Sequence, residues 1–186
     1  MKILLHICCA PCAVYPVEVL RGTLHQVRGF FYNPNIQPFQ EFARRIKALE
    51  DYADKAKLPV IWDRTYDLEG FLRLVAFREA DRCRFCYYLR LSAAARVARG
   101  GKFDAFTSTL LYSKFQNHDL IKAIGQQVVQ EVGVPFYYED FRRGWTQGRE
   151  KSRKMGLYKQ QYCGCIFSER DRFAAAPQAP RDGATH

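Results

Sequence analysis

The chain has 186 residues, of which 48% are hydrophobic and 15% aromatic, so it is long and apolar enough to bury one core. No apolar run approaches the roughly 18 residues that a membrane-spanning helix needs, which argues against a membrane protein. Lys and Arg total 29 against 19 Asp and Glu, a formal net charge of +10. This charge favours a polyanionic partner, nucleic acid first, with solubility alone as the alternative.

The N-terminal sequence MKILLHICCAPC superficially resembles a signal peptide. Its apolar part is too short and too rich in cysteine for that purpose and is better interpreted as a buried first strand, so a cytoplasmic protein is expected. Seven cysteines are many for a reducing compartment, where clustered thiols indicate metal binding or catalysis. The odd number also argues against a fully paired disulfide framework.

The predicted elements alternate between strands and helices along the chain. Short buried apolar runs predict strands, which fall at residues 2–7, 27–32, 59–62, 103–110 and 134–138. Helical spacing and end signals predict helices, which fall at residues 15–24, 38–57, 71–77, 82–99 and 118–132. Pro16 is expected in the first turn of the first helix, where proline is tolerated.

The C-terminal part reads differently from the rest. Residues 142–172 are basic and should be helical in pieces, whereas residues 174–186 are of low complexity and are expected to be disordered. One domain is therefore expected over residues 1–173. The alternation of strands and helices predicts the α/β class, with a parallel sheet covered by helices on both faces.

In such sheets the active site lies beyond the carboxyl ends of the strands. All seven cysteines fall in three groups, and the first group stands at such an end. The groups are Cys8, Cys9 and Cys12; Cys83 and Cys86; and Cys163 and Cys165.

Thiolates are soft ligands that suit iron–sulfur clusters, zinc and copper(I). A Cys-x-x-Cys motif places two sulfurs on one side of a tight turn, and the start of a helix favours the thiolate form. Two such motifs supply the four sulfurs that a [4Fe–4S] cluster takes. The alternative is a closed structural zinc site with four cysteine ligands. The three cysteines left over are more than such a zinc site needs.

Several polar residues outside the cysteine groups carry weaker signals. His6, inside the first predicted strand, is interpreted as a satisfied core residue, and His118 as a weak substrate contact. Arg44, Arg45 and Lys47 are interpreted as an ordinary exposed helix face.

A basic and aromatic segment leads directly into the third cysteine group. Arg and Lys neutralise phosphates, while Trp stacks on unpaired bases, so this segment is predicted to bind RNA. The alternative is a solvated helix face with Trp145 in the core. The candidate RNA-binding residues are Arg142, Arg143, Trp145, Arg149, Lys151, Arg153, Lys154 and Lys159.

Five motifs together resemble the QueH-type epoxyqueuosine reductases over about residues 2–172. They are HICCAPC (residues 6–12), FYNPNIQP (31–38), CRFCYYLRL (83–91), FTSTLLYSKFQN (106–117) and GLYKQQYCGCIFS (156–168). The resemblance implies reduction of the epoxide of epoxyqueuosine to queuosine at the wobble base of tRNA, the last step of queuosine biosynthesis. The electron donor is unidentified.

The resemblance also implies a fold similar to the adenine-nucleotide α-hydrolase or PP-loop (HUP-like Rossmannoid) fold. A [4Fe–4S] cluster would lie beside a second metal, a mononuclear iron. HICCAPC stands where PP-loop enzymes have a phosphate-cradling Ser-Gly-Gly loop, so no use of ATP is expected.

A two-electron deoxygenation suggests a division of labour between the two metals. The predicted partition gives the cluster Cys9, Cys12, Cys83 and Cys86. It leaves Cys8, Cys163 and Cys165 for the second iron or a catalytic redox pair. Adjacent residues on an extended chain point in opposite directions, so Cys8 and Cys9 are expected to serve different sites.

Asp81 and Asp140 are spare candidates for an oxygen ligand or a proton donor. Two other functions stay open at this point: a cluster-dependent sulfur-transfer protein, and a zinc-stabilised RNA-binding module without catalysis.

Overall fold

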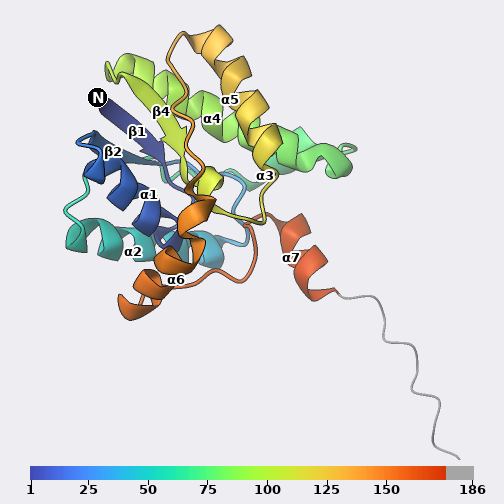
Figure 1. Cartoon of the computed structure of the whole chain (residues 1–186). Coiled ribbons are helices and arrows are strands. Elements are labelled where there is room, and N and C mark those ends of the chain that lie inside the picture. The colour runs from blue at the N-terminus through green and yellow to red at the C-terminus, as the bar shows by residue number, and fades with distance from the viewer. Residues whose placement is uncertain (175–186) are drawn as a thin grey trace, which may run out of the picture.

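The computed structural model describes residues 1–174, and residues 175–186, which hold nearly all of the tail predicted to be disordered, lie outside the described residues. A wholly parallel sheet in the order β3-β2-β1-β4 forms its centre (Figure 1). The strands are β1 (Lys2–His6), β2 (Gln26–Phe31), β3 (Val60–Trp62) and β4 (Ala105–Ser108).

Seven α-helices and three short 3₁₀ helices make up the rest of the described elements. The α-helices are α1 (Ala10–Gly22), α2 (Phe39–Lys55), α3 (Leu68–Val75), α4 (Arg82–Gly100), α5 (His118–Val132), α6 (Trp145–Lys154) and α7 (Ile166–Phe173). The 3₁₀ helices are η1 (Glu79–Asp81), η2 (Thr109–Tyr112) and η3 (Phe141–Gly144). None of the helices within residues 1–174 has both the length and the apolar character that crossing a membrane requires.

Helices cover the sheet on both faces, which confirms the predicted α/β class. Successive strand residues point to opposite faces. Phe31 packs against Phe42 of α2, with ring centroids 5.8 Å apart, whereas its neighbour Phe30 lines a cavity together with Ala93 and Val97 of α4. Helices α2 and α4 therefore lie on opposite faces. The more specific similarity to the PP-loop fold stays a prediction, as does the single domain over residues 1–173.

The central strand β1 pairs with β2 on one side and β4 on the other. Its residues Ile3, Leu4 and Leu5 are fully buried, as its continuous apolar sequence predicts. All four strands run the same way, so the segments that follow β1, β2 and β4 meet at one edge of the sheet. That edge receives Cys8 and the loop at residues 33–37.

The first predicted helix and the last predicted strand differ most from the structure. The first helix begins at Ala10 rather than at residue 15, because Pro11 fits the first turn, where no N–H donor is needed. Pro16 consequently lies inside the helix. The predicted fifth strand is only an isolated bridge between Phe106 and Phe136, since Pro135 has no N–H to extend the ladder.

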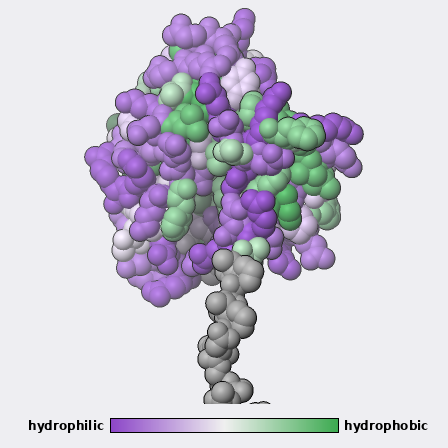
Figure 2. All heavy atoms as spheres, turned by 90° about the vertical axis from the view of Figure 1, so that its right-hand side faces the viewer, coloured by the Kyte–Doolittle hydropathy of each residue, from purple (hydrophilic) through white to green (hydrophobic). Residues whose placement is uncertain are grey.

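The C-terminal basic helix α6 packs closely on α1. The packing depends on Gly144, where a Cβ atom would lie only 2.1 Å from the ring of Tyr15, and on Gly148, where it would lie 2.4 Å from the Tyr112 hydroxyl. Figure 1 shows α6 beside α1, while α7 stands away from the sheet. Figure 2, which views the molecule from the right-hand side of Figure 1, shows mostly hydrophilic residues with hydrophobic ones in separate patches.

We expect Gly144→Ala to lower the free energy of unfolding by about 1–3 kcal/mol, because the added methyl group overpacks the junction between η3 and the Tyr15 ring. Chemical denaturation measures this change. The matched control is Gly100→Ala in the last turn of α4, where a Cβ atom meets nothing within 4 Å. Equal stability of both variants would show that α6 does not need its close approach to α1.

Candidate metal centre

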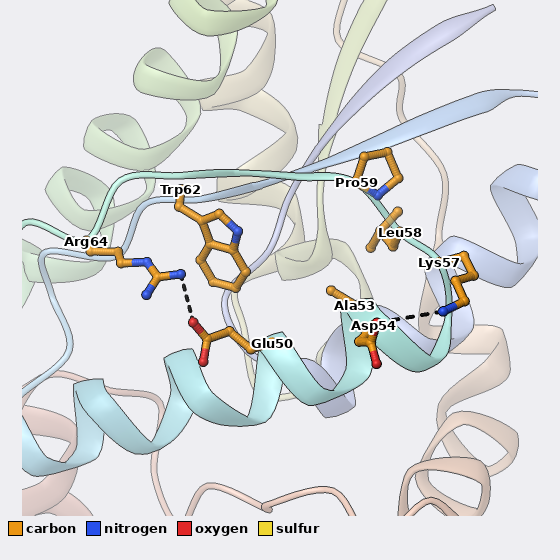
Figure 3. Close-up of a pocket in the computed structure, with 8 residues that line it drawn as sticks. All are labelled: Glu50, Ala53, Asp54, Lys57, Leu58, Pro59, Trp62 and Arg64. Atoms are coloured by element: carbon orange, nitrogen blue, oxygen red, sulfur yellow. Dashed lines mark ion pairs between the residues drawn. The ribbon is translucent and has the colours of Figure 1, made fainter.

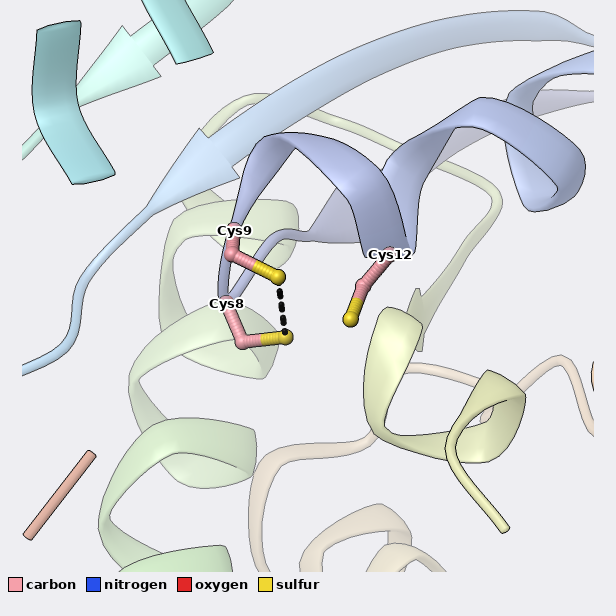
Figure 4. A group of neighbouring side chains, drawn as sticks. All are labelled: Cys8, Cys9 and Cys12. Carbon is pink, nitrogen blue, oxygen red and sulfur yellow. Dashed lines mark hydrogen bonds between the residues drawn. The ribbon is translucent and has the colours of Figure 1, made fainter. Parts of the chain in front are cut away.

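Three cysteine sulfurs gather at the junction of β1 and α1. Cys8 follows the strand, Cys9 is the N-cap residue of α1, and Cys12 lies in its first turn. The three sulfurs lie within 4.8 Å of one another and can hold a metal ion. The Sγ atoms of Cys8 and Cys9 are 3.8 Å apart (Figure 4). We call these residues the N-terminal triad.

The expectation that Cys8 and Cys9 point in opposite directions is wrong. It assumed that both residues belong to one extended strand. In the structure β1 ends at His6, and the chain turns into the helix directly after Cys9. The turn brings both side chains to the same side of the backbone, where Cys12 joins them.

The triad is supplied with hydrogen bonds from distant segments. Thr109 donates its hydroxyl to Cys8 Sγ at 3.3 Å and accepts the Cys8 N–H at 3.1 Å. Gln160 donates its Nε2 to Cys9 Sγ at 3.0 Å. Hydrogen bonds from Cys12 and Cys9 hold the pKa of Cys8 well below its usual value. Burial raises the pKa of Cys9, so the triad favours a single thiolate stabilised by neutral neighbours.

The second and third cysteine groups of the sequence come together at the start of α4. Cys83 and Cys86 lie in the first turn of this helix, and Cys86 packs with Cys165 in one small buried cluster. Burial raises the pKa of Cys86 to about 12, and the neighbouring charges of Cys163 and Cys165 add to this rise. Burial also raises the pKa of Cys83, and the charge of Cys163 raises it further. These four residues are the C-terminal quartet.

The cysteines therefore stand as a triad and a quartet. The predicted partition combines Cys9 and Cys12 with Cys83 and Cys86, and Cys8 with the third group, so it cuts across both sets. The distances within the triad favour a different division, in which Cys8 acts together with Cys9 and Cys12.

Two fully buried arginines lie beside the thiols. Arg90 of α4 places its Nη2 3.0 Å from Cys86 Sγ, and its positive charge also helps to lower the pKa of Cys8 after the larger hydrogen-bond effects. Arg45 of α2 donates to the carbonyl oxygens of Cys163 at 2.8 Å and Tyr162 at 3.0 Å. Buried positive charge of this kind stabilises nearby thiolates.

The interpretation of Arg45 as part of an exposed helix face is wrong, because its exposed fraction is 1%. Its position already carried a signal. Arg45 lies three residues after Phe42 and four before Leu49, on the apolar stripe of α2. Glu41, one turn earlier, accepts from its Nε at 2.7 Å. An arginine on the core side of a helix, preceded by a carboxylate at i−4, indicates a buried ion pair.

The Cys-Gly-Cys segment is held against the loop that follows β2. Gly164 has a φ of +148° and lies against Asn35, where a Cβ atom would approach the amide nitrogen to 3.1 Å. Only glycine fits both requirements. Gln37 donates its N–H to the Gly164 carbonyl oxygen at 2.9 Å, and its own carbonyl oxygen accepts the Tyr162 hydroxyl at 2.6 Å.

Buried amides around the two cysteine sets have free hydrogen-bonding capacity. Asn35 has an exposed fraction of 1%, and neither its Nδ2 nor its Oδ1 has a partner in the described structure. Asn33 Oδ1 and Gln160 Oε1 are also unpaired there. Each such atom costs about 1–3 kcal/mol when nothing satisfies it. Soft thiol donors together with unpaired amides fit a bound metal group and the polar ligands or substrate atoms around it.

The family described as Epoxyqueuosine reductase QueH matches residues 3–171. The chain is 34% identical to the Epoxyqueuosine reductase QueH of Dehalococcoides mccartyi, with 96% of this chain and 98% of the relative covered. It is also 34% identical to the protein of that name from Thermotoga maritima, with 91% of each chain covered. The chain belongs to the epoxyqueuosine reductase QueH family. The family resemblance of the five sequence motifs is thereby confirmed.

The basic segment of this QueH-family chain is only partly free to meet a ligand. Arg142 pairs with Asp140, Arg143 with Glu139, and Lys151 with Glu18. Trp145 is half-buried. The remaining candidates are exposed, and they are Arg149, Arg153, Lys154 and Lys159.

The polar residues with weaker sequence signals lie in different environments. His6 is the satisfied core residue that was expected, bonded to Ser108 Oγ at 2.8 Å, and burial lowers its pKa to about 4. His118 is buried at the start of α5, with both ring nitrogens unpaired among the described residues. A hydrogen bond from Arg142 lowers the pKa of Asp140 to about 2, which makes it a poor proton donor. Asp81 is exposed.

Two hollows in the described surface lie beside β3. One of about 490 Å³ opens between α2 and β3 (Figure 3). Its charged side chains satisfy each other, since Arg64 pairs with Glu50 at 2.7 Å and Lys57 with Asp54 at 3.7 Å. Its lining therefore offers none of the chemistry of the cysteine sets.

We expect Arg45→Met to lower the free energy of unfolding by about 3–5 kcal/mol, since it strips a buried ion pair of one partner. It should also release the segment at residues 156–165, because the carbonyl oxygens of Tyr162 and Cys163 lose their donors. Limited proteolysis with mass spectrometry locates the new cleavage sites.

The control for Arg45→Met is Lys47→Met on the same helix, where the ammonium group is exposed and pairs only with Asp51. It should leave stability and cleavage pattern unchanged. An Arg45→Met protein that resists protease as well as the control does would show that Arg45 does not hold the third cysteine group in place.

Proposed function

We propose that this protein reduces epoxyqueuosine to queuosine at the wobble position of tRNA, the last step of queuosine biosynthesis. One observation carries the proposal: in a chain of the QueH family, seven free cysteines from three distant segments gather at the carboxyl edge of a parallel sheet. The reaction removes one oxygen atom. Two C–O bonds break, one C=C bond forms, and two electrons with two protons release the oxygen as water.

The proposed cofactors are a [4Fe–4S] cluster and a second, mononuclear iron. When bound, they would supply single-electron transfer and a Lewis acid for the epoxide oxygen. The quartet of Cys83, Cys86, Cys163 and Cys165 offers four thiolates for the cluster, and the N-terminal triad offers three for the second metal. This division follows the spatial grouping, and the partition predicted from the sequence is its rival.

The protein's own residues have three tasks in this proposal. Arg45 and Arg90 offset the negative charge of thiolates that are largely shielded from water. Gln116 donates to the exposed Cys163 Sγ at 3.3 Å and orients this sulfur. Asn35 offers unpaired amide groups beside Gly164, where they can bond to a polar group bound between the two cysteine sets.

The metal content separates this proposal from a zinc-stabilised RNA-binding module. Protein expressed and reconstituted without oxygen should contain iron and sulfide, absorb broadly in the visible range, and convert epoxyqueuosine in tRNA when a low-potential reductant is added. Nucleoside digestion followed by mass spectrometry measures the conversion. Stoichiometric zinc, no iron and no conversion would favour the binding module instead.

Single serine variants test the division of the ligands. We expect Cys83→Ser and Cys165→Ser to lose the same part of the bound iron, and Cys9→Ser to lose a different part. Conversion should fall by about 100-fold or more in all three, because even outer partners of metal ligands contribute 10- to 100-fold. Iron and sulfide analysis with electron paramagnetic resonance distinguishes the two parts. A shared loss in Cys9→Ser and Cys83→Ser would restore the partition predicted from the sequence.

The exposed part of the basic segment is proposed to bind the tRNA backbone. The triple variant Arg149→Glu, Arg153→Glu, Lys154→Glu should weaken tRNA binding and leave iron content unchanged. For every phosphate that no longer meets a cation, the slope of log K against log salt concentration should fall by roughly one unit. Fluorescence anisotropy at several salt concentrations measures both effects.

A variant with the same change in net charge provides the control. Lys47→Glu, Lys57→Glu, Lys102→Glu reverses three exposed lysines outside the basic segment. If both triple variants weaken binding equally, the effect is one of overall charge, and the segment has no special role.

A further inference from the structure

The loop between η2 and α5 presents a phenylalanine to solvent. The side chain of Phe115 has an exposed fraction of 79%. The loop around it is nevertheless tied down on its far side. Tyr87 of α4 donates its hydroxyl to Gln116 Oε1 at 2.8 Å and accepts the Asn117 N–H at 3.3 Å. The exposed ring is therefore carried by a well-anchored loop.

Two further side chains complete an aromatic and cationic surface around this ring. Phe115 meets Trp145 edge to face, with centroids 5.5 Å apart and an interplanar angle of 81°. The Nζ of Lys114 lies 5.5 Å from the centre of the Trp145 ring. Tyr112 supports the indole from the core, at a centroid distance of 5.2 Å. We call Lys114, Phe115 and Trp145 the aromatic platform.

The platform adjoins the cysteine site directly. Gln116, the next residue after Phe115, donates to the exposed sulfur of Cys163 at 3.3 Å. Trp145 begins α6, the helix that carries the exposed Arg149 and Arg153. An extended ligand that reaches Cys163 thus passes an exposed ring, an ammonium group and a basic helix on its way.

We propose that the aromatic platform binds a nucleobase of the tRNA next to the base that reacts, by stacking on the Phe115 ring. This inference rests on the proposed function, which makes tRNA the substrate. Unpaired bases in RNA loops stack on aromatic side chains, while cations beside the ring neutralise the neighbouring phosphate. The stacked neighbour holds the loop open and sets the distance from the reacting base to Cys163.

The charge of the surroundings favours a nucleic acid over a protein as the occupant. The chain has a net charge of +10, Lys114 lies over the Trp145 ring, and Arg149 follows Trp145 on α6. An apolar protein surface would have to desolvate these cations without a counter-charge. A nucleotide offers a flat apolar face and a negative charge at once.

The test measures binding of short anticodon stem-loop hairpins to the reconstituted protein by fluorescence anisotropy. One hairpin carries all its bases, and two others lack the base on one or the other side of the wobble nucleotide. Phe115→Ala should weaken binding of the complete hairpin by about 5- to 150-fold, the range of one stacked base. Phe115→Tyr should retain wild-type affinity, since it keeps the aromatic face.

The hairpins without one base separate stacking from an effect on folding. Removing the stacking base should weaken binding to the wild-type protein as much as Phe115→Ala weakens binding of the complete hairpin. For the Phe115→Ala protein, removal of the same base should cause no further loss of affinity. Leu24→Ala is the control: Leu24 is 91% exposed and lies between α1 and β2, at the edge of the sheet opposite to the cysteines. It should bind every hairpin as the wild type does.

Three outcomes would overturn the inference. If Phe115→Ala binds the hairpin as tightly as the wild type and converts the tRNA normally, the platform does not bind a base, while the proposed function still stands. A change in self-association upon Phe115→Ala, seen by sedimentation without any change in RNA affinity, would assign the ring to an interface between proteins. A wild-type protein that neither binds nor converts the hairpin would overturn both the platform and the proposed function.

Discussion

Seven cysteines lie in one small region and are mostly withdrawn from water, and the cost of ionising them there is the constraint on which the rest of the structure depends. A thiol must lose its proton to bind a metal, and burial opposes this by raising its pKa, as Cys86 shows. Arg90 and Arg45 supply the compensating positive charge from opposite sides, one on α4 and one on α2. Because a buried guanidinium itself needs partners, each arginine also fixes the chain beside it. Arg45 donates to the carbonyl oxygens of Tyr162 and Cys163. The same side chain therefore supplies positive charge and holds the third cysteine group in place.

Parallel topology explains how distant segments reach this place. The segments that follow β1, β2 and β4 emerge at one edge of the sheet, which joins the N-terminal triad, the loop at residues 33–37 and Thr109 without any long connection. The sheet alone does not assemble the quartet, because Cys83 and Cys163 are far apart in the chain. It is closed by hydrogen bonds from the Cys-Gly-Cys segment to Gln37 and Arg45, which return the end of the chain to the loop after β2. The sheet thus determines the triad, and hydrogen bonds to the Cys-Gly-Cys segment determine the quartet.

The parts of this fold that follow from local sequence were predictable, and those that follow from tertiary packing were not. Apolar periodicity and caps predicted α5 at its observed bounds and β1 to within one residue, and cysteine spacing identified Cys8, Cys9 and Cys12 as a group that could hold a metal. The predicted directions of Cys8 and Cys9 were wrong because the chain was assumed to stay extended through both residues, whereas it bends at Cys8 and enters α1 directly after Cys9. The predicted exposure of Arg45 was wrong because its charge was given more weight than its place on the apolar stripe of α2. The predicted fifth strand failed because an apolar run says nothing about whether its backbone finds a partner.

Exposure distinguishes the cysteines from one another in a way that bears on how the site works. Cys9, Cys12, Cys86 and Cys165 are buried, whereas Cys83 and Cys163 are exposed, and Cys163 is hydrogen-bonded to Gln116. Gln116 belongs to the loop that also presents the exposed Phe115 ring, which packs on Trp145 at the start of α6. The side chain of Gln116 contacts the exposed sulfur of Cys163, and a peptide bond joins Gln116 to Phe115. In the proposed function, recognition of the ligand by Phe115 and the position of the Cys163 sulfur would be coupled within two adjacent residues, and hydrogen bonds with the buried Tyr87 of α4 hold both in place.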